Sequence, residues 1–347
     1  MLTVLQDQLD AARERLPDEV FEYYSAGAGD ELTLAESLVT WSQFRLRPKP
    51  LRNVAAVDLG IELFGPLHTP LVVAPMAFHR LAHPEAEVAS ARGAADAGAL
   101  LTVSTRASTR FEDVAASTTA PWWFQVYVMN DRGVTERVVE RATAAGASAL
   151  VLTGDTPYVG QKRRVGGVRI PMPDDHFLIN IAEHLDEGAD GRAAAAQDPS
   201  IGLETIDWLR RVSGLPVIVK GVLRGDSAVE CVQAGADGVI VSNHGGRQLD
   251  RAVTSASVLA EVADAVGADV PVLVDGGIRS GVDVFVALAL GARAVLIGRP
   301  VLWALAAGGR DGVAAALTAV RDDLAHAMAL AGTPSISDID RSFVRSA

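Results

Sequence analysis

Residues 217–250 read VIVKGVLRGDSAVECVQAGADGVIVSNHGGRQLD and have the pattern of a strand–helix–strand unit. The apolar runs Val217–Lys220 and Gly238–Val241 are short and rich in β-branched residues, which predicts two buried strands. Between them, Ser227–Gln233 has a helical pattern with a glycine beyond its last turn. Near-continuous apolar strands that alternate with helices are typical of a parallel sheet covered on both faces.

The same unit recurs along the chain on both sides of this stretch. Further apolar runs that predict strands are Leu71–Ala74, Ala99–Val103, Trp123–Tyr127, Ala149–Thr153, Val272–Val274 and Ala294–Ile297. Helical patterns between the runs cover Glu85–Asp96, Asp131–Ala144, Leu203–Arg211 and Ser257–Val266. Eight strand–helix units predict an α/β fold, a closed (β/α)8 TIM barrel, in preference to an open doubly wound sheet.

Three segments do not follow this alternation of strands and helices. Two helical stretches, Val4–Arg15 and Asp18–Ala26, precede the first strand, and a closing helix is expected at Val313–Met328. After the fourth strand, residues 163–202 form a long connection with little pattern, which predicts a lid over the top of the barrel. We expect a single domain, residues 1–347, with an N-terminal helical segment (1–70), the barrel (71–330) and this lid loop.

Composition excludes several classes of protein. The net charge of −12 argues against a general nucleic-acid binder, which needs a basic face. Cys231 is the one cysteine, so no intrachain disulfide is possible, and we expect a buried structural thiol on a helix. Charges interrupt the apolar positions of the first twenty residues, as in an amphipathic helix and not in a signal peptide. No apolar run reaches the ~20 residues of a membrane span, and we expect a cytoplasmic protein.

Polar and ionisable residues gather at the carboxyl ends of the predicted strands. Active sites of (β/α)8 barrels form at this rim, so the clustering favours a functional site. The residues at these ends are Ser104, Arg106, Gln125, Tyr127, Thr153, Asp155, Lys220, Ser242, His244, Arg247, Asp275, Arg279 and Arg299.

Glycine turns follow the last two strands and lead into helices. Backbone N–H groups of Gly277 and Gly298, together with Arg279 and Arg299, have the chemistry to hold a dianionic phosphate. The alternative is a pair of ordinary strand-to-helix turns with solvated arginines. Two such motifs on adjacent strands favour the phosphate site. Neither has the spacing of a dinucleotide fingerprint.

His244 differs from the other histidines because it lies in a glycine-flanked strand end with Arg247 three residues later. Asp155, on the same rim, could pair with the imidazole and raise its basicity. Such a pair beside a carboxylate-binding arginine suits proton removal from a 2-hydroxy acid. No spacing of metal ligands is present, and Asp174-Asp175-His176 is too weak a pattern to support a metal site.

Lys220 ends an apolar strand, where an ammonium group is costly without an anionic partner. A flavin whose pyrimidine edge becomes negative on reduction is such a partner. The alternative is a lysine that extends to the rim and keeps its charge in water.

Taken together, these motifs resemble the FMN-dependent 2-hydroxy-acid oxidase family, which includes glycolate oxidase, lactate oxidase and mandelate-oxidising enzymes. The resemblance runs through nearly the whole chain, from YYSAGAGDELTLAES (23–37) to GRPVLWALAAGG (298–309). Its most specific stretches are VKGV (219–222), VSNHGGRQLD (241–250), VDGGIRSGVDVF (274–285) and IGRPV (297–301).

The resemblance implies a role for each residue. It implies FMN contacts from Pro75, Met76, Ala77, Ser104, Gln125, Thr153, Lys220, Ser242, Asp275, Gly276, Gly277, Arg279, Gly298 and Arg299. His244 would be the base, oriented by Asp155. Tyr23 and Arg247 would bind the substrate carboxylate, and Tyr127 would hydrogen-bond the reacting hydroxyl or the developing oxo group.

The implied reaction oxidises a small L-2-hydroxy acid to the 2-oxo acid, with hydride transfer to flavin N5. Reoxidation by oxygen would give hydrogen peroxide, and the implied assembly is a homotetramer. The alternatives are a quinone or protein as electron acceptor, oxidative decarboxylation, or a non-catalytic FMN-binding barrel. A phosphate-binding barrel isomerase would share the phosphate cradle, but VSNHGGRQLD and Tyr23 argue against it.

Two residues depart from the family pattern at the substrate side. Arg106 stands where several members carry an aromatic or small apolar residue. Lys162 stands where the family usually has a second carboxylate-binding arginine, and Arg163 or Arg164 could replace it if the turn is shifted. We hypothesise that Arg106 selects a substrate with a second anionic or strongly polar group. The alternative is that Arg106 points to solvent or caps a helix.

Overall fold

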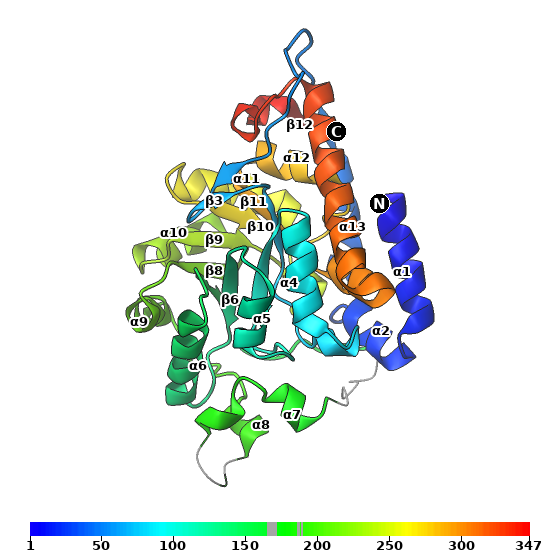
Figure 1. The fold of residues 1–347 in the computed structure, drawn as a ribbon. Helices are drawn as coiled ribbons and strands as arrows, with labels where there is room; N and C mark the ends of the chain where they lie inside the picture. Colours follow the sequence, from blue (N-terminus) through cyan, green and yellow to red (C-terminus); the bar gives the residue numbers. More distant parts are fainter. Residues whose placement is uncertain (165–171, 186–187, 189) are drawn as a thin grey trace.

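Eight parallel strands close into a barrel in this computed structural model, which describes residues 1–164, 172–185, 188 and 190–347 (Figure 1). They are β4 (Leu71–Val73), β5 (Leu100–Ser104), β6 (Trp122–Val126), β7 (Leu150–Thr153), β8 (Val217–Val222), β9 (Gly238–Val241), β10 (Val272–Val274) and β11 (Ala294–Ile297). The strands pair in sequence order, and β11 pairs with β4 to complete the ring. The predicted (β/α)8 fold is confirmed, and each strand lies within two residues of its predicted bounds.

The barrel interior is packed with side chains. Alternate residues of each strand point inward, as the period of a strand requires. They form one cluster with Leu63: Val72, Ala74, Leu100, Trp123, Ala149, Val151, Ile218, Ile240, Leu273, Ala294 and Leu296. The intervening residues, such as Leu71 and Val73, pack outward against the helices in a second, larger core. The barrel is therefore a rigid support for whatever its carboxyl rim holds.

The helices around the barrel are α4 (Ala86–Asp96), α5 (Phe111–Ser117), α6 (Arg132–Ala144), α9 (Glu204–Ser213), α10 (Gly225–Gln233), α11 (Ser255–Val266), α12 (Gly281–Ala289) and α13 (Arg299–Ala331). The predicted bounds of the closing helix, Val313–Met328, were wrong, because α13 begins directly after β11. Its path bends at Gly308 and Gly309, which have non-helical backbone angles. Those glycines interrupt the helical pattern and hid the first three turns of α13.

The N-terminal segment contains α1 (Thr3–Arg15), α2 (Asp18–Ser25) and α3 (Leu32–Val39). Figure 1 shows α1 in blue alongside the orange α13, where the Gln8 side chain donates to the carbonyl of Gly312 at 2.8 Å. Two small ribbons, β1 (Phe44–Leu46) with β12 (Val344–Ser346) and β2 (Ile61–Glu62) with β3 (Pro66–Leu67), complete this region. Short 3-10 turns cover Thr40–Gln43, His79–Leu81, Ala182–His184, His244–Gly246, Ile336–Asp338 and Arg341–Phe343.

The described part of the connection after β7 contains two short helices, α7 (Asp174–Phe177) and α8 (Gly191–Ala194). They lie at the end of the molecule opposite the β1–β12 ribbon (Figure 1). None of the described helices is long and apolar enough to cross a membrane. Cys231 is a buried free thiol within α10, as the sequence predicts.

Candidate active site

A cavity of about 550 Å³ opens at the carboxyl ends of the barrel strands. Strand ends, the N-terminal segment and the connection after β7 all contribute to its wall. Most of the residues predicted from sequence line it: Tyr23, Pro75, Met76, Ala77, Ser104, Arg106, Tyr127, Lys162, Lys220, His244, Arg247, Asp275, Gly276, Gly277, Arg279, Gly298 and Arg299. Residues separated by more than 270 positions in sequence thus meet at one site.

The remaining predicted residues lie behind the cavity wall and hydrogen-bond to it. Ser104 donates to the Gln125 side-chain oxygen at 2.9 Å, and the Gln125 amide donates to Thr153 at 3.0 Å. All three side chains are buried. The backbone N–H of Thr105 also donates to the Gln125 side-chain oxygen, at 3.3 Å, and fixes the orientation of the amide. Gln125 and Thr153 act on the cavity through Ser104, whereas Asp155 contacts His244 and Ser242 contacts Lys220.

His244 and Asp155 form a direct pair, with 3.0 Å between His244 Nδ1 and Asp155 Oδ1. His244 has a left-handed backbone, with φ of 56°, and its amide donates to Ser242 Oγ at 3.0 Å. Burial alone would raise the pKa of Asp155, but the charge and hydrogen bond of His244, with help from Lys220, hold it below its usual value. An ionised Asp155 accepts a hydrogen bond from the Nδ1–H group, which leaves His244 Nε2 as the reactive nitrogen.

Lys220 is buried beside a carboxylate of the protein itself. Its Nζ lies 2.9 Å from Asp275 Oδ2 and donates to Ser242 Oγ at 2.7 Å. Burial lowers the pKa of Lys220, but Asp275 and Asp155 outweigh it, so the pKa lies above its usual value and the amine is charged. Asp275 is thus an anionic partner within the protein, beside the flavin edge that the sequence predicts.

Glycines shape the wall between β10 and β11. Gly277 has φ of 83°, and a Cβ there would lie 1.8 Å from the Ser37 carbonyl oxygen, so only glycine fits. The carbonyl of Gly276 accepts a hydrogen bond from Trp41 Nε1 at 2.8 Å. At Gly298, a Cβ would have only ordinary contacts, the nearest at 3.7 Å from Met76 Sδ. The turn after β10 is thus held tightly against the N-terminal segment, while the turn after β11 has room for a small side chain at Gly298.

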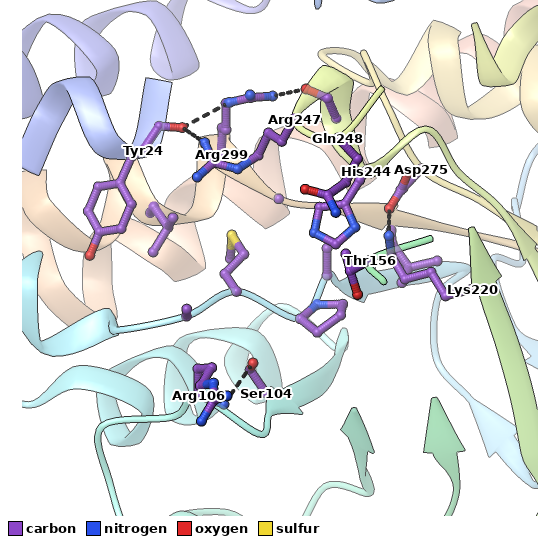
Figure 2. A pocket seen from close by; sticks show the side chains of 18 of the residues that line it. Tyr24, Ser104, Arg106, Thr156, Lys220, His244, Arg247, Gln248, Asp275 and Arg299 are labelled. Atoms are coloured by element: carbon purple, nitrogen blue, oxygen red, sulfur yellow. Dashed lines mark hydrogen bonds and ion pairs between the residues drawn. The ribbon is translucent and has the colours of Figure 1, made fainter. Parts of the chain in front are cut away.

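Two arginines join the rim to the N-terminal segment through carbonyl groups (Figure 2). Arg247 Nη1 donates to the carbonyls of Tyr23, Tyr24 and Ala26 at 2.9, 3.1 and 2.9 Å. Arg299 donates to the carbonyls of Tyr24 and Gly245 at 3.0 and 2.8 Å. Burial, with the nearby charges of Arg247 and Arg279, places the pKa of Arg299 well below its usual value. An anion in this cavity would relieve that crowding of positive charge.

Tyr23 and Tyr127 present partly buried phenols to the cavity. Burial raises the pKa of both, against the opposing effect of Arg247 and Arg106. Both hydroxyls therefore stay protonated and can donate hydrogen bonds at neutral pH. The Tyr23 ring also lies under the Arg247 guanidinium, 5.2 Å from ring centre to Cζ.

Lys162, and neither of the arginines after it, lines the cavity. Its Nζ donates to the Gly160 carbonyl at 3.2 Å. Burial, with repulsion from Arg247 and Arg299, lowers the pKa of Lys162 to about 8. Arg163 pairs with Asp30, and Arg164 pairs with Glu31 and Glu22, so neither replaces Lys162 at the site.

Several lining residues were missed from sequence. Tyr24 donates its hydroxyl to the carbonyl of Phe78 at 2.6 Å, and Phe177 packs 5.7 Å from Phe78, centre to centre. Tyr24 is adjacent to the predicted Tyr23, but a carbonyl contact leaves no pattern in sequence. Phe177 lies in the predicted lid, where no periodicity distinguishes it.

The residues present fit a phosphorylated flavin and give no sign of a metal. Within the described ranges, no group of three or more His, Cys, Asp or Glu side chains could hold a metal ion. Asp275 Oδ1 is buried without a hydrogen-bond partner among the described residues, which suits a hydroxyl donor from a ligand. Backbone amides and Arg279, whose pKa burial lowers to about 10, suit a phosphate.

A closed (β/α)8 barrel with a buried lysine–aspartate pair and a cationic glycine cradle at its rim defines a flavin-dependent oxidoreductase. Residues 12–346 match the FMN-dependent dehydrogenase family, and the chain belongs to this family, with FMN as its cofactor. It is 43% identical to an L-lactate oxidase of Nostoc sp. over 96% of this chain and 95% of that protein.

Solved structures agree with this assignment. A mandelate oxidase crystal structure has a TM-score of 0.88 and 40% identity, covering 97% of this chain and 96% of that one. An active chimera of (S)-mandelate dehydrogenase has a TM-score of 0.93 and 35% identity, covering 99% of each chain. Proteins named as oxidases and as dehydrogenases therefore share this fold.

Proposed function

We propose that the protein oxidises a small L-2-hydroxy acid to the corresponding 2-oxo acid and passes the electrons to oxygen. The observation that carries this proposal is that His244, paired with Asp155, lines the same cavity as the guanidinium of Arg247. The relatives support it, because an L-lactate oxidase and a mandelate oxidase are named for substrates of this class.

The substrate carboxylate binds to Arg247, with Lys162 and the Tyr23 hydroxyl beside it. Arg247 uses Nη1 for the carbonyls of the N-terminal segment, which leaves Nη2 for the carboxylate. This anchoring fixes the guanidinium before substrate arrives, so little side-chain entropy is lost on binding.

Proton removal falls to His244 Nε2, because Nδ1 is occupied by Asp155. The substrate hydroxyl donates its proton to Nε2, and the ionised Asp155 stabilises the imidazolium that results. Tyr127 keeps its phenolic proton, since its pKa is raised, and donates a hydrogen bond to the developing oxo group. The chemistry that FMN supplies when bound is acceptance of the two electrons and the hydrogen leaving the substrate α carbon.

The residues that would hold the cofactor form three groups. Lys220 and Asp275, with the Ser104 end of the Ser104–Gln125–Thr153 chain, would bind the polar ring edge and the ribityl hydroxyls. Arg279, Arg299 and the amides of the two glycine turns would hold the phosphate, and Pro75, Met76 and Ala77, which line the cavity after β4, would contact the ring.

An anaerobic titration tests the proposed function. The purified FMN-loaded protein is mixed with monocarboxylic, aromatic and dicarboxylic 2-hydroxy acids, and the visible flavin absorbance is followed. We expect bleaching by L-2-hydroxy acids and none by their D enantiomers. On admission of air, the colour should return with one hydrogen peroxide formed per 2-oxo acid.

Each other outcome overturns a separate part of the proposal. If air does not restore the colour of the bleached flavin but a quinone does, the electron acceptor is a quinone and not oxygen. If the protein is yellow but no 2-hydroxy acid bleaches it, the proposed reaction is wrong. We also propose a cytoplasmic homotetramer, on the family resemblance; light scattering at a mass other than four chains would contradict the assembly.

A further inference from the structure

Arg106 is the charged residue of the cavity that the proposed reaction does not use. It follows β5 and lines the wall on the side opposite Arg247 and Arg299 (Figure 2). Its charge acts on Tyr127 and Tyr23, the two phenols assigned to the substrate, so it stands within electrostatic range of the bound hydroxy acid. Arg106 is therefore placed to meet the substrate side chain rather than the FMN phosphate.

The hydrogen bonds of Arg106 are only partly satisfied. Nη2 donates to the carbonyl of Ala195, at the carboxyl end of α8, and the guanidinium lies over the Phe177 ring at 4.9 Å. Nη1 is shielded from solvent and has no hydrogen-bond partner among the described residues. A shielded cationic N–H without an acceptor is costly, and an acceptor carried by a ligand would remove that cost.

The charges around the cavity also favour a ligand that carries a further anionic group. Its described lining carries the cations Arg106, Lys162, Lys220, Arg247, Arg279 and Arg299 but one carboxylate, that of Asp275. Asp275 neutralises Lys220, and the FMN phosphate, with a charge of about −1.5 to −2, neutralises Arg279 and Arg299. One substrate carboxylate then faces Arg247, Lys162 and Arg106. A second carboxylate would offset part of the positive charge that remains, at Arg106.

We propose that the preferred substrate is a 2-hydroxy dicarboxylic acid whose second carboxylate binds Arg106. This inference rests on the proposed function and narrows its substrate class. The first carboxylate binds Arg247 and Lys162, and the α carbon lies between the two anchors, beside His244. Arg106 also joins the barrel to the connection after β7, through the Phe177 ring and the Ala195 carbonyl.

Equilibrium binding of acids that lack a hydroxyl tests the proposal without any oxidation. Succinate and glutarate are titrated against propionate and butyrate by calorimetry, with the wild-type FMN-loaded protein. We expect the better dicarboxylate to bind about 10- to 100-fold more tightly than either monocarboxylate, as a charge-assisted hydrogen-bonded contact provides. Equal affinities in the wild type overturn the inference, and this comparison needs no variant.

Two variants separate recognition from anchoring of the connection after β7. Arg106→Leu should lose the dicarboxylate preference and bind propionate within about threefold of the wild type, because only the second anchor is removed. Arg192→Leu is the matched control, since Arg192 also lies over Phe177, at 4.4 Å, but does not line the cavity. It should keep the preference. A parallel loss of mono- and dicarboxylate binding in Arg106→Leu would reduce Arg106 to an anchor and overturn the proposal.

The hydroxy-acid titration keeps this inference distinct from the proposed function. Bleaching by dicarboxylic 2-hydroxy acids at a higher kcat/KM than by monocarboxylic ones supports both. Faster bleaching by monocarboxylic acids overturns the substrate class alone. Absence of bleaching by every 2-hydroxy acid overturns the proposed function, whereas the succinate and propionate affinities still decide the role of Arg106.

Discussion

Gly221 makes room for Asp155. A Cβ at position 221 would lie 2.5 Å from Asp155 Cβ and 2.6 Å from its Cγ, and Gly221 has φ of 107°. The register of β8 against β9 shifts at this point, between Lys220 and Val222. The irregularity in β8 therefore holds the Asp155 carboxylate in place. Asp155 in turn orients the proposed base, His244, at the end of the neighbouring strand β9.

Replacing Gly221 with alanine should displace Asp155 and lower kcat by about 100-fold, the cost of a misplaced catalytic group. Gly235→Ala is the matched control, because its φ of 101° is similar and its nearest neighbour is 3.9 Å away. Both variants should lose stability through backbone strain. Steady-state kinetics checks the prediction, which fails if the two variants lose kcat equally.

Asp155→Asn should lower the rate of anaerobic flavin reduction by about 100- to 10,000-fold, the usual range for a lost acid–base contribution. The neutral amide can no longer stabilise the imidazolium or fix its Nδ1 tautomer. Stopped-flow spectroscopy measures the rate, and the flavin content should equal that of the wild type because Asp155 lies behind the cavity wall. An unchanged reduction rate would remove Asp155 from the mechanism.

Binding of propionate should weaken as the pH rises through about 8, because the pKa of Lys162 is lowered to that value by burial and by Arg247 and Arg299. The sign follows from charge: Lys162 is protonated and attractive below this pH and neutral above it. The dissociation constant should rise by up to about tenfold per pH unit beyond pH 8. Lys162→Arg should abolish the dependence, since arginine stays charged. The same pH profile in both proteins would assign the titration to another group.

Ala86→Gly should stabilise the protein by about 0.5–1 kcal/mol. Ala86 is buried at the start of α4 with a left-handed φ of 45°. This conformation costs a side-chain-bearing residue about 1–2 kcal/mol, which exceeds the 0.5–1 kcal/mol entropic cost of glycine. Ala91→Gly, within the same helix, is the control and should destabilise by about 1 kcal/mol or more. Denaturant unfolding measures both, and destabilisation by Ala86→Gly would contradict the strain.

The fold was predictable because its signals are local. Each strand is a short apolar run with polar or glycine residues at its end, and most of the runs are separated by a single helical pattern. The bent α13 shows where prediction from local pattern fails, because Gly308 and Gly309 break the helical pattern without ending the helix. Helix propensity is a property of a short local stretch of sequence. The length of α13 depends instead on its packing against α1 and α4.

The site was predictable where strand ends present side chains to one rim, as for His244 and Asp155. It was not predictable where the contact is to a distant backbone carbonyl, as for Arg247 with the N-terminal segment. The partner of Lys220 was missed for a related reason. Asp275 follows a different strand, and closure of the barrel, not sequence spacing, brings the two charges within 2.9 Å.

The bonds from Arg299 to the carbonyls of Tyr24 and Ala26 constrain the order of events during synthesis. The ribosome makes α2 long before it makes Arg299, which directly follows the strand that closes the ring against β4. These contacts of α2 with the barrel therefore form only after Arg299 has been made. Before β11 and Arg299 have been made, the chain has neither a closed barrel nor a complete phosphate cradle, so flavin binding waits for these residues.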